Sequence, residues 1–263
     1  MASPNAMPAV DAPPAKDRHR WIRCFHPTAE TSPQVVCFPH AGGAASYYFA
    51  LSRALTPHVE VVAVQYPGRQ DRRREPLVDN IPALADQIFD VLEPMDGLRP
   101  YAFFGHSMGS IIAFEVARRL QRAGAVGPQV LVVSGRRGPA VQRAERYHLR
   151  DDEGFVSELR AMDGTDPRLL EDPELLATVL PVARADYKAI ETYECPSEAI
   201  LQCPIVALVG DVDPRARVDE VAAWAVHTTG EFDMKVFQGG HFYLDTHWQD
   251  VADVIRQAVG SGT

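Results

Sequence analysis

The stretch Gly105–Gly109 (GHSMG) places a serine, Ser107, in the local setting of an activated nucleophile. The apolar residues Tyr101–Phe104 before it predict a short buried strand, and the apolar residues after it predict a packed helix. The two glycines of the motif allow this strand and helix to approach closely, which raises the serine hydroxyl above the sheet. A G-x-S-x-G match alone occurs by chance in many chains, so its interpretation depends on the strand–turn–helix setting.

A serine hydroxyl is a weak nucleophile at neutral pH, so it needs a base, and the base needs a partner that holds its tautomer. His241 is the predicted base, because it lies in the loop between the last predicted strand and the final helix, directly after two flexible glycines. His58, His227 and His247 lie in a loop or near helix ends, where solvated or capping histidines are usual.

Two aspartates, Asp211 and Asp213, are candidates for the partner of that base. Both follow the apolar run Ile205–Val209, at the carboxyl end of a predicted strand, where sites in open parallel sheets form. Asp213 is the preferred acid, because it lies farther beyond Gly210 and the chain has room to turn toward the histidine. The alternative role for Asp211 is to cap or brace the loop.

Two backbone N–H groups are predicted to bind a developing oxyanion. One belongs to Met108, which directly follows the nucleophile, and the other to Ala41, in the loop Pro39–Gly43 (PHAGG) after the first predicted strand. An ordinary strand-to-helix turn is the alternative interpretation of that loop. His40 and His106 are interpreted as supporting or loop residues, outside the triad.

Apolar runs and helical patterns alternate along the chain, which predicts an α/β fold with a mostly parallel central sheet flanked by helices. The predicted strands are 34–38, 59–65, 101–104, 129–134, 205–210 and 233–237, and the predicted helices are 46–55, 81–92, 108–123, 218–228 and 249–259.

About 70 residues separate the strands that end at Ser134 and begin at Ile205, far more than a crossover needs. Helical apolar spacing within residues 140–200 predicts an inserted helical lid over the nucleophile, with Pro181 kinking or dividing its second segment. The alternative is a helical subdomain that only thickens the core.

Composition narrows the class of protein. The 26 basic and 35 acidic residues give a net charge of −9, which argues against nucleic-acid binding.

Residues 1–20 are rich in alanine and proline and lack the apolar core of a secretory signal, so they are predicted to be a disordered tail before a single domain, 21–263. The chain has no apolar run long enough to span a membrane, and its four cysteines form no C-x-x-C pair, so we expect reduced core cysteines in a soluble cytoplasmic protein. No metal or cofactor is predicted.

Arg69, Arg72, Arg73 and Arg74 form a basic run with two interpretations. It is either a docking patch for an acidic protein or a phosphate, or a solvated loop whose charge Asp71 and Glu75 dilute.

Five sequence blocks, in order, resemble the stand-alone type II thioesterases that accompany polyketide and nonribosomal peptide synthases. They are 37–43 (CFPHAGG), 65–69 (QYPGR), 105–109 (GHSMG), 210–213 (GDVD) and 239–242 (GGHF). The resemblance extends from about Trp21 to about Val259 and implies an α/β-hydrolase fold with a helical lid; residues 180–187 (LPVARADY) are similar to the lid segment of that family.

The resemblance implies hydrolysis of acyl groups from the phosphopantetheine thiol of carrier proteins, which removes misprimed or stalled units from the assembly line. Ser107 would attack the thioester, and His241 would take up and return a proton. The alternatives within the fold are a carboxylic ester hydrolase and an acyltransferase. The non-enzymatic alternative is an inactive hydrolase fold that acts as a binding module, against which the presence of Ser107, Asp213 and His241 argues.

Overall fold

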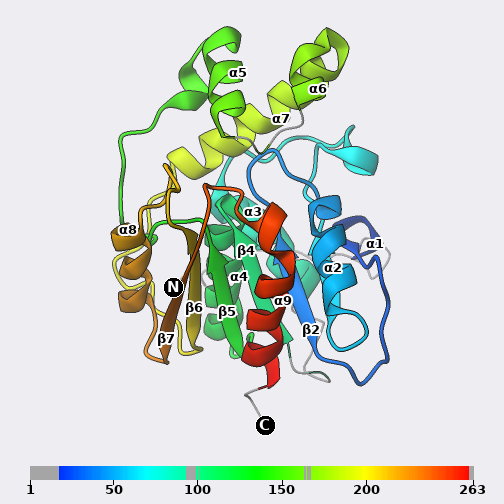
Figure 1. Cartoon of the computed structure of the whole chain (residues 1–263), viewed down its shortest axis with the longest axis vertical. Coiled ribbons are helices and arrows are strands. Elements are labelled where there is room, and N and C mark those ends of the chain that lie inside the picture. Colours follow the sequence, from blue (N-terminus) through cyan, green and yellow to red (C-terminus); the bar gives the residue numbers. More distant parts are fainter. Residues whose placement is uncertain (1–17, 93–98, 100, 163, 165–166, 261–263) are drawn as a thin grey trace, which may run out of the picture.

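The computed structural model describes residues 18–92, 99, 101–162, 164 and 167–260 (Figure 1). The described strands form one seven-stranded sheet in the order β1-β3-β2-β4-β5-β6-β7, and every neighbouring pair is parallel except β1 with β3. The strands are β1 (Ile22–Arg23), β2 (Gln34–Phe38), β3 (Glu60–Val64), β4 (Tyr101–His106), β5 (Val130–Ser134), β6 (Ile205–Gly210) and β7 (Phe232–Phe237).

Helices cover both faces of this sheet, so the inner strands are apolar on both sides. Helices α3 (Ile81–Leu92) and α4 (Met108–Ala123) pack on one face, against Val36 and Phe38 among others. Helices α2 (Phe49–Leu55) and α9 (Leu244–Gly260) pack on the other, against the alternate β2 side chains Val35 and Cys37 (Figure 1). The alternation of side chains along β2 therefore divides the core into two layers.

The predicted and observed elements agree closely. The bounds of β2, β6, α3 and α4 are those predicted, and the mostly parallel α/β arrangement is confirmed. The predicted helix 46–55 is divided between a 3₁₀ turn, Ala45–Tyr48, and α2, and the predicted helix 218–228 between α8 (Val218–Ala222) and a 3₁₀ turn, Ala223–His227. The two-residue strand β1 was not predicted, because so short a segment carries no alternation that a sequence pattern could reveal.

Helices α5 (Asp152–Ala161), α6 (Pro167–Glu171) and α7 (Pro173–Glu191) lie above the sheet in Figure 1, on the side where its parallel strands end. They share a small core of their own, formed by Phe155, Val156, Leu159, Leu170, Leu180 and Ala183. Helix α7 continues through Pro181, so the predicted division of this segment at the proline is wrong. Packing of the apolar face offsets the lost backbone hydrogen bond.

Most of the predicted N-terminal tail lies outside the described residues. Its last three residues, 18–20, are helical and belong to α1 (Arg18–Trp21), which ends at the buried Trp21. The Arg72 guanidinium lies 3.9 Å from the centre of the Trp21 ring, a cation–π contact that holds this turn against the domain. No described helix is long and apolar enough to cross a membrane.

The four cysteines are free thiols, and only Cys37 is fully buried. Cys195 and Cys203 are half-buried and pack against the main core, whereas Cys24 is exposed, so the prediction of core cysteines is wrong for Cys24. Cys24 directly follows the short edge strand β1, where one side of the chain faces solvent.

Candidate active site

Ser107 occupies a sharp turn between β4 and α4. Its backbone has φ 54° and ψ −117°, an uncommon conformation for a residue with a side chain, and its N–H donates to the Ser134 carbonyl at 2.8 Å. A Cβ atom on Gly109 would lie 1.9 Å from the Phe38 carbonyl oxygen, and one on Gly105 would lie 2.3 Å from the Gly109 oxygen. Both glycines are therefore required by the close approach of backbone segments around the serine.

His241 and Asp213 form a buried hydrogen-bonded pair. The distance from His241 Nδ1 to Asp213 Oδ2 is 2.8 Å, and Asp213 Oδ1 accepts the Arg215 N–H at 2.7 Å and the Ala216 N–H at 3.2 Å. These backbone donors fix the carboxylate, and the carboxylate in turn fixes the imidazole with Nδ1 as donor. His241 Nε2 is then available to accept a proton.

Asp211 has a different partner. Its Oδ1 accepts the Gly239 N–H at 2.9 Å, while its own N–H donates to the Phe237 carbonyl at 2.8 Å. Asp211 therefore links the loop after β6 to the loop that carries His241, which is the bracing role considered for it from the sequence.

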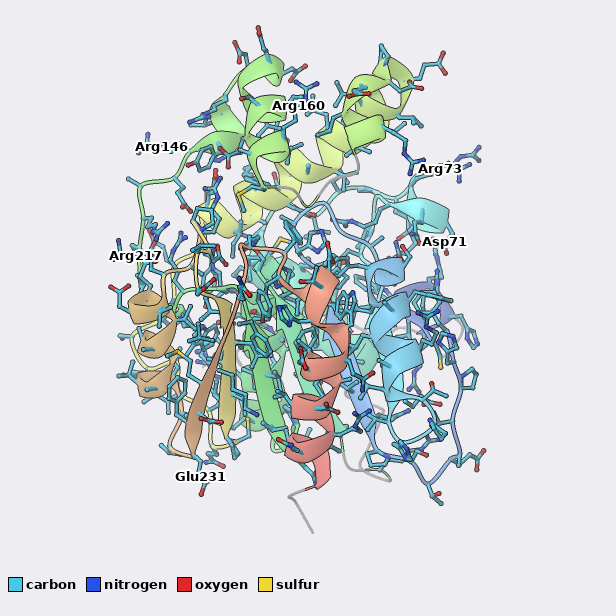
Figure 2. All side chains as sticks on the ribbon, in the orientation of Figure 1. Asp71, Arg73, Arg146, Arg160, Arg217 and Glu231 are labelled. Carbon is cyan, nitrogen blue, oxygen red and sulfur yellow. The ribbon has the colours of Figure 1, made fainter. Side chains whose placement is uncertain are left out.

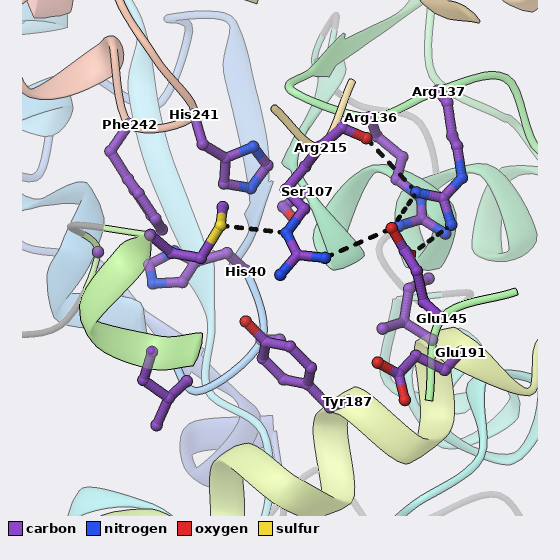
Figure 3. Close-up of a pocket in the computed structure, with 15 residues that line it drawn as sticks. His40, Ser107, Arg136, Arg137, Glu145, Tyr187, Glu191, Arg215, His241 and Phe242 are labelled. Carbon is purple, nitrogen blue, oxygen red and sulfur yellow. Dashed lines mark hydrogen bonds and ion pairs between the residues drawn. The ribbon is translucent and has the colours of Figure 1, made fainter. Parts of the chain in front are cut away.

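Ser107, His241 and Ala41 line one cavity of about 60 Å³ at the carboxyl edge of the sheet (Figure 3). Met108 is fully buried as the first residue of α4, directly after Ser107. The fold thus brings all five predicted site residues to one region, although they come from four separate loops. Such an arrangement can position a nucleophile, its base and backbone N–H donors around one carbonyl group.

The opposite wall of the cavity comes from the helical insertion. Leu159 and Met162 contribute from the α5 side, and Tyr187, Ile190 and Glu191 contribute from α7. Figure 3 shows the Tyr187 ring extending from α7 into the cavity. The helical spacing of Leu159 with Met162 and of Tyr187 with Ile190 was the available sequence signal, but it does not by itself show that these side chains face a cavity.

A charged cluster at one end of the cavity was not predicted. Glu145 accepts from Arg137 Nη2 at 2.7 Å and from Arg215 Nη1 at 3.4 Å, and Arg215 Nε lies 3.1 Å from Met162 Sδ. Arg136 Nε is buried without a hydrogen-bond partner among the described residues, and burial together with the Arg137 charge lowers the pKa of Arg136 to about 9. The pair Arg136–Arg137 directly after β5 was the signal that could have identified this cluster, since the carboxyl ends of parallel strands converge.

His40 and His106 pack around His241 as neutral rings. The centre of the His106 ring lies 5.0 Å from that of His241 and 5.9 Å from that of His40. Burial, together with the nearby His241, lowers the pKa of His40 to about 3 and that of His106 well below its usual value. His106 Nδ1 lies 3.0 Å from Ser134 Oγ, so this ring also ties β4 to β5.

These buried imidazoles predict an acid-sensitive fold. In the unfolded chain a histidine takes up a proton near pH 6.5, whereas His40 in the folded protein remains neutral down to about pH 3. Between these values the unfolded state binds more protons, so the free energy of unfolding falls as the pH falls. Each such histidine contributes a slope of about 1.4 kcal/mol per pH unit.

We expect His40→Gln to reduce the pH dependence of the free energy of unfolding between pH 6 and pH 4 by about 1.4 kcal/mol per pH unit, the contribution of one proton. Urea unfolding at each pH measures this change. His58→Gln is the matched control, because His58 is exposed. Equal slopes for the wild type and His40→Gln would contradict the assignment of His40 as a neutral buried group.

The basic run 69–74 does not form a continuous patch. Arg69 is buried and forms an ion pair with Asp186, and Arg72 is buried and pairs with Glu75 at 2.6 Å. Only Arg73 and Arg74 are exposed, and Arg73 points away from the body of the protein (Figure 2). Two of the four arginines therefore have structural partners, and a docking patch of all four is excluded.

The fold and the site together define a serine hydrolase of the α/β-hydrolase fold. Residues 33–259 match the family model described as a thioesterase domain. The chain belongs to the thioesterase family.

Several similar proteins are thioesterases, two of them named for a biosynthetic pathway or cluster. The chain is 47% identical over 246 residues to thioesterase PikA5 of Streptomyces venezuelae, covering 94% of this chain and 88% of that protein. It is 50% identical over 240 residues to a probable cadicidin biosynthesis thioesterase of Streptomyces griseus, covering 91% of this chain and 66% of that longer protein. The solved structure of BorB, a type II thioesterase from the borrelidin biosynthetic cluster, superposes with a TM-score of 0.82 at 44% identity, covering 91% of this chain and 96% of BorB.

Proposed function

We propose that this thioesterase hydrolyses acyl groups from the phosphopantetheine thiol of carrier proteins and thereby clears misprimed or stalled units from polyketide or nonribosomal peptide assembly lines. The observation that carries the proposal is the buried His241–Asp213 pair beside Ser107 in a chain whose relatives include a type II thioesterase of the borrelidin cluster and another of a nonribosomal peptide/polyketide pathway. The carrier proteins are the proposed partners.

In the proposed reaction, Ser107 Oγ attacks the thioester carbonyl while His241 Nε2 takes the serine proton. The N–H groups of Ala41 and Met108 bind the oxyanion of the tetrahedral intermediate. The C–S bond then breaks, the thiol leaves with the proton from His241, and an acyl-serine remains. Water, deprotonated by His241, attacks the acyl-serine, and collapse of the second intermediate returns the proton to Ser107 and releases the carboxylic acid. Asp213 holds the imidazole and stabilises its cationic form throughout.

The size of the cavity bears on the length of acyl chain that the site can hold. The cavity at Ser107 has a volume of about 60 Å³, and a larger cavity of about 450 Å³ shares Met162, His241 and Phe242 with it. A short acyl group therefore fits beside Ser107, and a longer chain extends either into the neighbouring cavity or against Leu159 and Ile190, whose helices would then have to move. This supports a lid role for the insertion at residues 140–200.

Intact-mass measurement of acylated carrier proteins tests the proposal. We expect the wild-type enzyme to convert acyl carrier protein to the free-thiol form with loss of the acyl mass, and to act on a two- or three-carbon acyl group faster than on a long one. Ser107→Ala should leave all acyl groups in place. Failure of the wild-type enzyme to release any acyl group from carrier proteins would overturn the proposal.

Two further measurements separate the alternatives. A higher kcat/KM for the matching oxygen ester than for the carrier thioester would indicate an ester hydrolase. Capture of the acyl group by an added alcohol or thiol in preference to water would indicate an acyltransferase.

A further inference from the structure

We propose that Asp186 is a positioning residue for the oxyanion hole: its carboxylate, carried by α7, holds the loop that contains Ala41 by binding the adjacent Gly42 N–H and Arg69 together. This inference rests on the proposed oxyanion role of Ala41 and deepens it, because it connects that role to the helix that walls the acyl cavity.

The contacts of Asp186 join three segments that are far apart in the sequence. Asp186 Oδ2 accepts the Gly42 N–H at 2.7 Å and also accepts from Arg69 Nη2. The side chains of Arg69 and Asp186 are only 8% and 3% exposed, so little water competes for these bonds. A buried charge-assisted hydrogen bond to a backbone N–H is strong and directional.

The loop before Ala41 is held by a second set of side chains. Tyr48 Oη donates to the Phe38 carbonyl at 2.7 Å, and Tyr66 Oη donates to the Pro39 carbonyl at 3.1 Å. These bonds fix the chain on the amino side of Ala41, and the Asp186 bond to Gly42 fixes it on the carboxyl side. With both flanks held, the direction of the Ala41 N–H is determined in advance, which is what an effective oxyanion donor requires.

Gly42 lies directly against α7. Its φ of +77° lies in the left-handed region, and a Cβ atom there would already contact the Ala183 Cβ of α7 at 3.6 Å. The loop and the helix therefore pack directly, and Asp186 lies one helical turn beyond Ala183 on the same side.

Arg69 supplies the charge that allows a carboxylate to be buried at this place. Its Nη1 also donates to the Pro67 carbonyl at 2.8 Å, so the guanidinium is tied to its own loop as well as to α7. Removing only one member of the pair leaves the other charge buried without compensation, which destabilises the fold for reasons unrelated to the oxyanion. A test must therefore remove both charges.

The arrangement links the acyl cavity to the oxyanion donor. Tyr187, the next residue after Asp186, and Ile190 line the cavity from the same helix. Displacement of α7 to admit a long acyl chain would also withdraw the carboxylate from Gly42. The enzyme would then bind the chain but stabilise its tetrahedral intermediate poorly until α7 returned.

The double variant Arg69→Met/Asp186→Leu tests this inference, because it removes both buried charges and keeps similar side-chain volumes while leaving the Gly42 N–H without its acceptor. We expect a folded protein whose kcat on a small acyl thioester falls about 10- to 100-fold with KM nearly unchanged, less than the loss of about 10²- to 10³-fold seen when an oxyanion donor is deleted outright. Affinity for a trifluoromethyl ketone that forms a tetrahedral adduct should fall by the same factor, and affinity for the carboxylic acid product should not change.

The variant Glu115→Gln is a control for lost stability, since it breaks buried ion pairs of Glu115 with Arg118 and Arg119 on α4 without touching the contacts of the Pro39–Gly43 loop. It should change thermal stability without changing the affinity for the tetrahedral analogue. Wild-type kcat and wild-type analogue affinity in the double variant would overturn the positioning role. Because the substrate is a small thioester, this result is independent of whether the enzyme recognises carrier proteins.

Discussion

Replacing Ser107 with alanine is expected to lower kcat for thioester hydrolysis by about 10⁴- to 10⁶-fold, the range found when the nucleophile of a serine hydrolase is removed. Alanine lacks the oxygen that forms the acyl-enzyme but retains the backbone of the turn. The N–H of residue 107 can still donate to the Ser134 carbonyl. We therefore expect a thermal unfolding midpoint close to that of the wild type, and a loss confined to chemistry.

Labelling with a fluorophosphonate probe and intact-mass measurement provide the check. The wild type should gain one probe mass, and Ser107→Ala should gain none. Ser157→Ala is the control, because Ser157 is exposed on α5. Equal labelling of wild type and Ser107→Ala, or activity retained in the variant, would show that another residue is the nucleophile.

The second large effect is expected at Asp213. Asparagine at this position preserves the shape but offers an amide in place of a carboxylate, so it favours the wrong imidazole tautomer and cannot stabilise the cationic ring. The bond from His241 Nδ1 to Asp213 Oδ2, 2.8 Å long and buried, is the interaction that this change disrupts. We expect kcat to fall by about 10³- to 10⁴-fold.

Asp211→Asn is the matched control, two residues away on the same loop. An asparagine Oδ1 can still accept the Gly239 N–H that Asp211 Oδ1 accepts at 2.9 Å, so we expect a loss of less than about 10-fold. Steady-state kinetics on one small thioester, with stability measured for each variant, compares the two. A larger kcat loss at Asp211 than at Asp213 would reverse the assignment of the acid.

The sequence predicted the scaffold well because its signals are local. Strand β2 is a short continuous apolar run, helices α3 and α4 each carry their own apolar periodicity, and the turn at Ser107 carries its own pair of glycines. Signals of this kind depend only on neighbours within a few positions. The two-residue strand β1 and the 3₁₀ turn before α2 have no such pattern, and their form depends on the surfaces against which they pack.

The amino-acid sequence by itself determined the α/β alternation, the nucleophile turn and the loop that carries His241. Only the tertiary structure decided that His241 bonds to Asp213 and not to Asp211. It likewise decided that Arg69 forms a buried ion pair with Asp186, 117 positions away, and is not part of an exposed patch. The physical reason is that hydrogen bonds and ion pairs between distant segments depend on burial and on relative orientation, which exist only after the sheet and its helices have packed.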